Sequence, residues 1–268
     1  MRILFVLVLY NTKLEQCLTY QTFLFQLKQD TIYVYDNSPH SQDYIKELVG
    51  YYIHDASNPG LGVAYNKAAQ YAKDNHYDWL LFVDQDTTFP EGMYEVYLKA
   101  IQENRHIYMF APPVCIAPGK YMSPVRLMGK LGRVTSCVPK GKVISLYKDS
   151  PINSGLCVSV DKFFQCRGYK PEVFLDYSDF QFIERFRKIS DQCFIVDKEV
   201  YQAYSAFVDT PEKALLRLSL FCKSIRACDR YSIGDDVGYL LVVLKRTLSL
   251  VLKCKSLRPI QIFIQSYF

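Results

Sequence analysis

Apolar residues along the chain fall into continuous runs and helically spaced stretches. Residues 3–9 are apolar without interruption, which is typical of a strand buried on both faces of a sheet. Further short runs, rich in aromatic and β-branched residues, predict strands at 31–35, 51–54 and 79–83. Between these runs, apolar residues recur at helical spacing over 14–25 and 65–72. This alternation predicts an α/β fold, with a mostly parallel sheet flanked by helices.

The second half of the chain has a less regular pattern. Over residues 115–150 the periodicity weakens and Pro, Gly and basic residues recur, so we expect an irregular excursion over the face that binds ligands. A strand is predicted at 155–160, and a helical stretch follows Asp179. Two longer stretches with helical spacing predict C-terminal helices at 211–226 and 237–253.

Length and composition agree with this organisation. A chain of 268 residues is long enough for one large α/β domain with a small helical appendage. We expect the domain to span residues 1–208 and the helical region to span 209–268. Half of the residues are hydrophobic and 22% are charged, so the chain is expected to fold around a packed core.

Charge, cysteines and the first residues narrow the class of protein. The net charge of +5 is spread along the chain without a long basic tract, so nucleic acid is not an expected partner. The nine cysteines are scattered and form no CxxC pair, which is typical of reduced thiols in a cytoplasmic protein. Residues 1–10 lack a small-residue cleavage site, so we interpret them as a first strand and not as a signal peptide.

Polar residues with chemical potential follow the predicted strands. In open α/β sheets, ligands bind beyond the carboxyl ends of the strands. The sharpest signal is Asp84-Gln85-Asp86, because two carboxylates just past a buried strand can share one divalent cation, Mg²⁺ or Mn²⁺. Two acids in a loop are more often a solvated turn, but the preceding buried strand favours the metal interpretation.

Three other segments each have a structural alternative. Residues 58–62 contain glycines before a helix, which either free backbone amides for a ligand or form a plain turn. Asp36 reaches a base or ribose, or stabilises a turn, and the turn is favoured. In the segment 174–179, Asp179 is a candidate general base that also suits the N-cap of the following helix.

The order of these motifs carries a resemblance over about three quarters of the chain. The motifs are Val8-Leu9-Tyr10-Asn11, Asp36-Asn37-Ser38, the glycine-containing segment 58–66, Asp84-Gln85-Asp86-Thr87, Asn153-Ser154-Gly155 and the segment 174–179. Together they resemble glycosyltransferase family 2 and are most similar to its rhamnosyltransferase-like branch. The resemblance implies a Rossmann-like GT-A fold, a nucleoside-diphosphate sugar donor, a divalent cation and an inverting mechanism.

The resemblance also implies roles for individual residues. Asp84 and Asp86 would hold the metal, and Asp179 would be the catalytic base. Ser154, Gly155 and Asp176 would lie on the acceptor side. The donor would contact Tyr10, Asn11, Asp36, Asn58, Gly60, Gly62, Asn66, Asp84 and Gln85.

Two positions depart from the pattern of the branch. Gln181 stands where relatives often have a glutamate. Gln202, in the stretch 201–205, stands where many relatives have a histidine near the diphosphate. Glutamine is a weaker metal ligand than imidazole.

These observations support a leading function and two alternatives. The leading expectation is transfer of a hexose or deoxyhexose, with rhamnose as the candidate, to a glycan or lipid-linked glycan in surface polysaccharide synthesis. A nucleotidyltransferase would need a basic, Gly-rich loop after the first strand, which residues 8–12 lack. A non-catalytic nucleotide-sugar-binding relative is the other alternative, and Gln202 favours it.

The last predicted helix suggests where the protein acts. Leu241, Leu244, Leu248, Val251 and Leu252 share one helical face beside basic residues. Such a face either packs on the domain or lies on an anionic membrane surface. We therefore expect a cytoplasmic protein, with peripheral contact to the inner face of the membrane as one of two equal alternatives.

Overall fold

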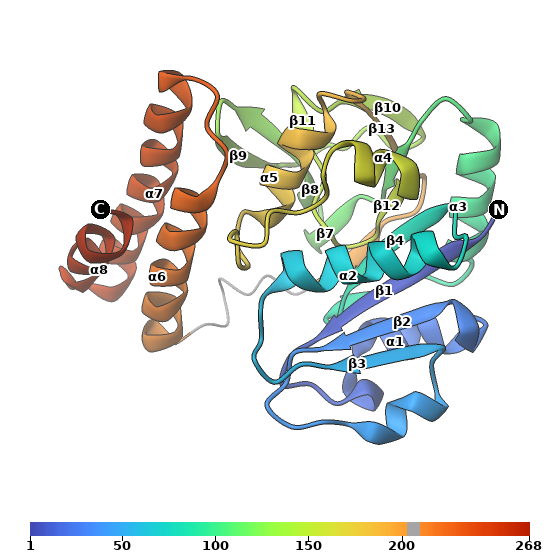
Figure 1. Ribbon diagram of the computed structural model, residues 1–268. Coiled ribbons are helices and arrows are strands. Elements are labelled where there is room, and N and C mark those ends of the chain that lie inside the picture. Colours follow the sequence, from blue (N-terminus) through green and yellow to red (C-terminus); the bar gives the residue numbers. More distant parts are fainter. Residues whose placement is uncertain (203–209) are drawn as a thin grey trace.

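The computed structural model of the protein describes residues 1–202 and 210–268. The predicted boundary between domain and helical region, at residue 208, lies outside the described residues, as do Ala203, Tyr204 and Ser205 of the stretch compared with relatives. The chain forms one large mixed sheet, a second smaller sheet and a layer of C-terminal helices (Figure 1).

The large sheet has eight strands in the order β10-β13-β6-β12-β4-β1-β2-β3. The run β4-β1-β2-β3 is parallel throughout, as the sequence predicts. These four strands are β1 (Ile3–Leu9), β2 (Ile32–Asp36), β3 (Tyr51–His54) and β4 (Trp79–Asp84). The other half is mixed and contains β6 (Met109–Ala111), β10 (Lys142–Ser145), β12 (Leu156–Ser159) and β13 (Gln192–Ile195).

Both faces of the large sheet are covered, which explains the uninterrupted apolar run of β1. Leu4, Val6 and Val8 point into one core cluster, with residues of the helices α2 (Leu61–Asp74), α4 (Val160–Gln165) and α5 (Ser178–Phe186). The alternate residues, such as Phe5 and Leu7, point into a second cluster with α3 (Met93–Glu103) and the segment around α1 (Leu18–Thr22). Because successive side chains of a strand face opposite sides, each β1 residue is buried.

The prediction of one continuous helix over 14–25 is wrong. The segment consists of the 3₁₀ turn η1 (Leu14–Gln16), the five-residue α1 and the 3₁₀ turn η2 (Leu24–Gln26). Cys17 and Phe23 interrupt it with non-helical backbone angles. Their side chains are buried against the sheet, so packing rather than helical periodicity produces the apolar spacing. Two more 3₁₀ turns are η3 (Gln29–Thr31) and η4 (Asp43–Glu47).

The irregular excursion expected over 115–150 is also wrong, because most of this region forms strands. The second sheet has the order β11-β8-β7-β14-β5, with β9 paired to β8. Its strands are β5 (Thr87–Thr88), β7 (Val114–Ala117), β8 (Lys120–Met128), β9 (Leu131–Thr135), β11 (Asp149–Ser150) and β14 (Val200–Gln202). β9 has no buried residue, so an apolar run that would reveal it is missing. Gly119 and Gly129, both at positive φ, form the turns on either side of β8.

The C-terminal helices are α6 (Pro211–Ala227), α7 (Ile233–Cys254) and α8 (Arg258–Tyr267), and they lie together at one side of the molecule (Figure 1). α7 begins four residues before the predicted start, because Ser232 and Asp235 form a capping box. α8 was not predicted. The inner faces of the three helices share a core cluster with Val173 and Tyr177, next to α5.

Candidate active site

The carboxyl ends of β1, β2 and β4 meet at one edge of the sheet, as the sequence predicts. In the register of the sheet, Leu9 pairs with Asp36 and Val8 pairs with Asp84. The segments that follow are tied together. Gln85 Oε1 accepts a hydrogen bond from the backbone N–H of Tyr10 at 2.9 Å. Ser38 Oγ accepts one from the N–H of Asn11, also at 2.9 Å.

Two carboxylates project from the end of β4. Asp84 is half-buried and receives a hydrogen bond from the hydroxyl of Ser154, whereas Asp86 is exposed. β14 pairs with β5, which places Gln202 opposite Thr87 and beside both acids. The Gln202 amide donates from Nε2 to Asp86 Oδ1 at 2.7 Å, and its Oε1 lies 2.9 Å from Ser154 Oγ.

The electrostatics of this pair favour a bound cation. Burial raises the pKa of Asp84 to about 6, and the charge of Asp86 adds to the shift, while hydrogen bonds from Ser154 and Gln202 oppose it. A divalent cation relieves both causes, because it supplies opposite charge to crowded carboxylates. Carboxylate oxygens from Asp84 and Asp86 suit Mg²⁺ or Mn²⁺. Within residues 1–202 and 210–268, no group of three His, Cys, Asp or Glu side chains could hold a metal, so water or phosphate oxygens would complete the shell.

A residue that the sequence did not reveal holds the loop of the two acids. Thr19 of α1 is buried, and its hydroxyl contacts the backbone carbonyls of Asp84 and Thr87, the latter at 2.8 Å. The loop therefore keeps its shape without using the carboxylates. No local pattern around Thr19 indicates this role, because its partners lie more than sixty residues away.

Asp179 lies near Asp84, on the first turn of α5. The predicted N-cap role is wrong: the helix begins at Ser178 with Tyr177 as its N-cap, and the Asp179 carboxylate accepts from the N–H of Phe180 at 2.8 Å. Burial raises the pKa of Asp179 to about 7, and the charge of Asp84 contributes. A carboxylate with a pKa near neutrality can accept a proton at physiological pH.

Tyr65 of α2 is a second residue that the sequence did not reveal. Its hydroxyl is buried and has no hydrogen-bond partner among the described residues. Burial raises its pKa well above the usual value, and the charges of both Asp84 and Asp179 contribute. Tyr65 therefore lies close to both carboxylates and connects the site to the core of the sheet.

The glycine-containing turn before α2 packs against the loop that leads to Asp179. A Cβ on Gly60, whose φ is +93°, would lie 2.5 Å from the carbonyl oxygen of Phe174. A Cβ on Gly62 would lie 3.0 Å from the carbonyl oxygen of Lys170. The Leu61 N–H donates to the Phe174 carbonyl at 3.0 Å. These glycines thus allow the turn before α2 to approach the loop before α5. This contact positions the start of α5.

Three other predicted donor residues also have partners within the protein. Asn58 has a positive φ of 46° in the same turn, and its backbone N–H donates to the carbonyl oxygen of Asp55 at 3.1 Å. Asn66 exchanges two hydrogen bonds with the backbone of Tyr169, at 2.8 and 3.0 Å. Asp36 is buried and accepts from Tyr52 at 2.9 Å and from the Ser38 N–H at 2.9 Å. These contacts stabilise the loops at the edge of the sheet, and contact with a donor stays a prediction.

Gly155 and Asp176, predicted on the acceptor side, have well-defined surroundings. Gly155 has a φ of +85°, and a Cβ there would meet Pro112 at 2.7 Å. Asp176 is paired with Arg217 of α6 at 2.9 Å and with Arg246 of α7 at 2.8 Å. Burial acts to raise its pKa, but the two arginines outweigh it and the pKa lies below the usual value. Asp176 thus links the site to the C-terminal helices.

Gln181, the other departure from the branch pattern, is fully buried on α5. Its Oε1 accepts from the backbone N–H of Asp229 at 2.7 Å. Asp229 also pairs with Arg185 at 2.6 Å and with Lys170 at 2.9 Å. Gln181 therefore joins α5 to the α6–α7 connection.

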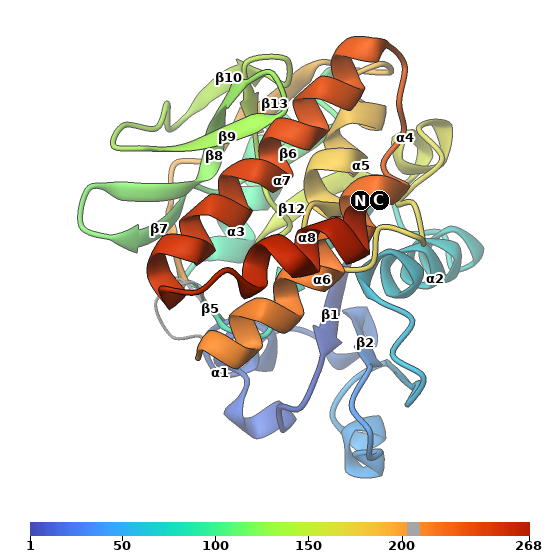
Figure 2. The same ribbon diagram turned by 90° about the vertical axis from the view of Figure 1, so that its left-hand side faces the viewer.

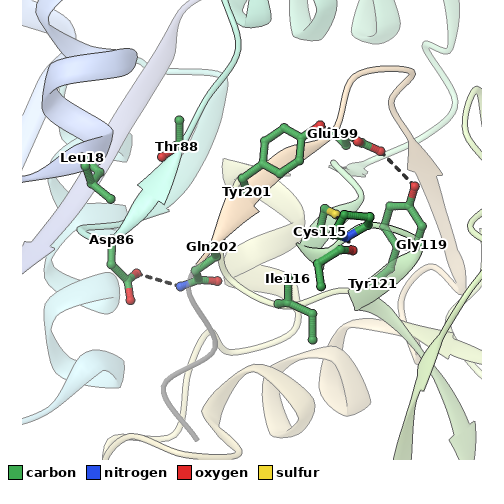
Figure 3. A pocket seen from close by; sticks show the side chains of 12 residues that line it. Leu18, Asp86, Thr88, Cys115, Ile116, Gly119, Tyr121, Glu199, Tyr201 and Gln202 are labelled. Atoms are coloured by element: carbon green, nitrogen blue, oxygen red, sulfur yellow. Dashed lines mark hydrogen bonds between the residues drawn. The ribbon is translucent and has the colours of Figure 1, made fainter. Parts of the chain in front are cut away.

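A cavity of about 540 Å³ opens beside Asp86 and Gln202 (Figure 3). Tyr121 and Tyr201 both line it, and both hydroxyls donate to Glu199, at 3.0 and 2.6 Å. Lys140 pairs with the same carboxylate at 2.6 Å. The second sheet, which the sequence did not predict, builds most of this wall.

Comparisons with known proteins agree with this arrangement. Residues 6–177 match the family model described as Glycosyl transferase family 2. No curated protein sequence matches the chain. Six solved structures that resemble it are 12–17% identical and therefore show a shared fold only.

Three of these structures contain different ligands. TarS 1-349 of S. aureus in complex with UDP-GlcNAc is 15% identical with a TM-score of 0.56, over 99% of this chain and 79% of that one. The mannosyltransferase PcManGT from Pyrobaculum calidifontis, in complex with GDP-Man and Mn²⁺, is 12% identical with a TM-score of 0.50, over 98% and 79%.

The third structure is GalNAc-T7 with UDP, GalNAc and Mn²⁺, at 14% identity and a TM-score of 0.56 over 76% of this chain. The chain spans only 44% of GalNAc-T7. These structures confirm the predicted α/β GT-A fold. Since the family model covers more than half of the residues, the chain belongs to glycosyl transferase family 2.

Proposed function

We propose that the protein is an inverting glycosyltransferase that moves a sugar from a nucleoside-diphosphate donor to a glycan acceptor. The observation that carries this proposal is a third acid, Asp179, which lies close enough to Asp84 for the two charges to interact and whose pKa is raised to about 7. One pair of acids suits a cation and a diphosphate, and the separate acid suits proton transfer.

The chain's own residues prepare the donor site. Thr19 fixes the loop between β4 and β5, and Ser154 and Gln202 orient the two carboxylates. Mg²⁺ or Mn²⁺ held by Asp84 and Asp86 would neutralise the charge that develops on the departing diphosphate. The segments after β1 and β2, with Tyr10, Asn11 and Asp36, flank this position and are the proposed place of the nucleoside.

Asp179 is the proposed general base. It accepts the proton of an acceptor hydroxyl while that oxygen forms a bond to the anomeric carbon of the donor sugar. The bond from the anomeric carbon to the diphosphate breaks, and its electron pair leaves with the nucleoside diphosphate. Attack opposite the leaving group inverts the anomeric configuration, and Asp179 then returns its proton to solvent.

Rhamnose is the donor sugar that the resemblance of the motifs favours, and the proposed role is in surface polysaccharide synthesis. TarS was solved with UDP-GlcNAc and PcManGT with GDP-Man, so these donors belong in the same comparison. The cavity beside Asp86 is the proposed subsite for the acceptor glycan. Its exposed Tyr201 and half-buried Tyr121 offer aromatic faces to a sugar ring, and their hydroxyls are already held by Glu199.

The test is a panel of nucleotide sugars, with dTDP-rhamnose, UDP-GlcNAc and GDP-mannose, incubated with Mn²⁺. Release of nucleoside diphosphate should occur with one donor and should fall by at least about 10²-fold in Asp179→Asn, the usual scale for loss of a general base. Donor binding, measured by calorimetry, should barely change. Asp74→Asn, which alters an exposed acid on α2, is the matched control.

The alternatives give different results in the same experiment. Binding of a donor without turnover would identify a non-catalytic relative. Pyrophosphate release from a nucleoside triphosphate would identify a nucleotidyltransferase. An active Asp179→Asn would show that Asp179 is not the base.

A further inference from the structure

The outward face of α7 exposes a continuous apolar stripe. Ile233, Val237, Leu241, Leu248 and Leu252 are 83, 54, 50, 57 and 78% exposed. Their spacing places them on one side of the helix along almost its whole length. Figure 2 shows α7 crossing the surface of the molecule, with α8 beside its C-terminal half.

This stripe is separate from the face that α7 uses for packing. Tyr239, Val242, Val243 and Thr247 are buried on the opposite side, where Tyr239, Val242 and Val243 join the core cluster of the C-terminal helices. A helix at the surface of a folded protein normally presents polar residues to water. The inner face thus accounts for the packing of α7 within the protein. The apolar outer face is not used in this packing, and an apolar face of this kind typically binds a partner or a membrane.

The stripe is flanked by positive charge from Val237 onward, whereas Asp235 and Asp236 at its N-terminal end are each paired with a cation, Lys130 and Arg230. Residues 237–268 contain five basic residues and no acidic residue. Arg246 points inward and pairs with Asp176, whereas Lys245, Lys255 and Arg258 are exposed beside the stripe and at its C-terminal end. Leu257, in the turn to α8, is 68% exposed among these cations.

We propose that the outward face of α7, with the α7–α8 turn, docks on an anionic lipid surface. Apolar side chains that enter the lipid boundary and cations that meet lipid phosphates are the two components of such binding. Pairing of this face with a second copy would bring the same cations together, which disfavours it. None of the helices in the described parts of the chain is long and apolar enough to cross a membrane. The proposal does not rest on the proposed transfer reaction.

The test is flotation of the full chain with vesicles, either of pure phosphatidylcholine or of phosphatidylcholine mixed with phosphatidylglycerol. Binding is expected only to the mixed vesicles and should weaken as salt is raised. Lys245→Gln with Lys255→Gln should lower the partition coefficient about five-fold for each cation removed, since one basic residue near such a surface is worth about 1 kcal/mol. Leu241→Gln with Leu248→Gln should lower it by about ten-fold or more.

The matched control is Phe25→Gln with Lys28→Gln, which removes one exposed apolar and one exposed basic side chain from another part of the surface. It should bind vesicles like the unaltered protein. Thermal unfolding of every variant confirms that each is folded, since all altered residues are exposed.

Three outcomes would overturn the proposal: no binding to mixed vesicles at low salt, equal binding to both vesicle types, or binding that the α7 variants leave unchanged. Light scattering that shows a dimer in the unaltered protein, and a monomer in Leu241→Gln with Leu248→Gln, would assign the stripe to self-association instead. Sugar transfer is measured separately in solution with a soluble acceptor, so failure to bind vesicles and failure to transfer sugar are distinguishable.

Discussion

Asp84 and Asp86 are two residues apart but have different environments. Asp84 is enclosed by Ser154, Gln202 and the core, so its ionised form is disfavoured and its pKa is raised to about 6. Asp86 is exposed. Within the described residues, Gln202 is the one side chain that donates a hydrogen bond to it. Asp86 is therefore the acid with free coordination sites, and Asp84 is the acid that gains most from a nearby positive charge.

Asp86→Ala should abolish Mn²⁺-dependent binding of a nucleoside diphosphate, because Asp84 would be left as a single, partly enclosed ligand. Calorimetry with and without Mn²⁺ measures this directly. Asp74→Ala removes an exposed acid from α2 and should leave binding unchanged. Equal Mn²⁺-dependent binding by folded Asp86→Ala would show that this carboxylate does not hold the metal.

Gln202→His should strengthen Mn²⁺ binding, because imidazole is the better ligand and would occupy the same place beside Asp86. We expect the apparent Kd for Mn²⁺ to fall on the order of ten-fold. Tyr201→Phe, a change at the neighbouring residue whose hydroxyl donates to Glu199 instead, is the control. A Kd that rises in Gln202→His would indicate that the amide hydrogen bond to Asp86 matters more than ligand strength.

The raised pKa of Asp179 has consequences for both activity and stability. The base must be ionised, so kcat/KM should fall as the pH drops through about 7. For stability, the folded state holds the proton more tightly than the unfolded chain, whose pKa is near 3.8. The free energy of unfolding therefore decreases as the pH rises from about 4 to 7.

Asp179→Asn removes the ionisable group and therefore this loss of stability at higher pH. Without metal, the variant should be more stable than the unaltered protein above pH 7, by at most about 4 kcal/mol, at about 1.4 kcal/mol per pKa unit. The gain should disappear near pH 4, where Asp179 is protonated in both states. Thermal unfolding across this pH range measures it, and a variant that is less stable at pH 8 would contradict the raised pKa.

At the scale of elements, the C-terminal helices hold α5 and the loop before it from two sides. Before the helix, Asp176 pairs with Arg217 of α6 and Arg246 of α7. Within α5, Glu184 pairs with Lys130 at 2.7 Å and accepts from Tyr239 of α7 at 2.9 Å. Asp179 lies between these two attachments, so α6 and α7 set the position of the proposed base.

Arg246→Met keeps the length of the side chain and removes its charge. It should destabilise the protein by about 2 kcal/mol, between the values typical of exposed and of buried ion pairs, because Asp176 is mostly buried. Arg126→Met is the control, since its partner Asp149 is similarly enclosed but Arg126 itself is 60% exposed. It should cost less than about 1 kcal/mol. Equal losses in the two variants, by chemical denaturation, would contradict a holding role for α7.

At the scale of the whole molecule, the C-terminal helices and the α/β domain are expected to unfold together. Lys130, from the turn between β8 and β9, Glu184 of α5 and Tyr239 of α7 form one buried network across the two parts. The helices also share their core cluster with Val173 and Tyr177. The two parts therefore depend on the same contacts.

Tyr239→Phe removes only the hydroxyl of that network and should cost about 1–3 kcal/mol, because it leaves Glu184 short of a buried hydrogen bond. The melting temperature should fall for the whole protein, with circular dichroism and tyrosine absorbance changing in one transition. Two separate transitions, of which only one shifts, would show that the helical region folds independently.

The sequence by itself determined the features that depend on local pattern. The strands β1, β2 and β4 were predictable because burial on both faces of a sheet leaves an uninterrupted apolar run, and the helix α2 because burial on one face leaves a periodic one. The edge strand β3 has no buried residue and was predictable only from its aromatic and β-branched residues. The acids after β4 were predictable because polar residues directly after a buried strand lie at the edge where parallel strands end.

Only the tertiary structure decided the features that depend on distant pairing. The second sheet was missed for two reasons. β9 has no buried residue and so shows no apolar run, and β14 pairs with strands that are distant in the sequence. The same pairing brings Gln202 to Asp86, 116 residues away. Gly60 and Gly62 accommodate the loop before α5, which no local signal shows. The raised pKa of Asp179 likewise arises from burial and from the charge of Asp84, which the folded chain alone brings together.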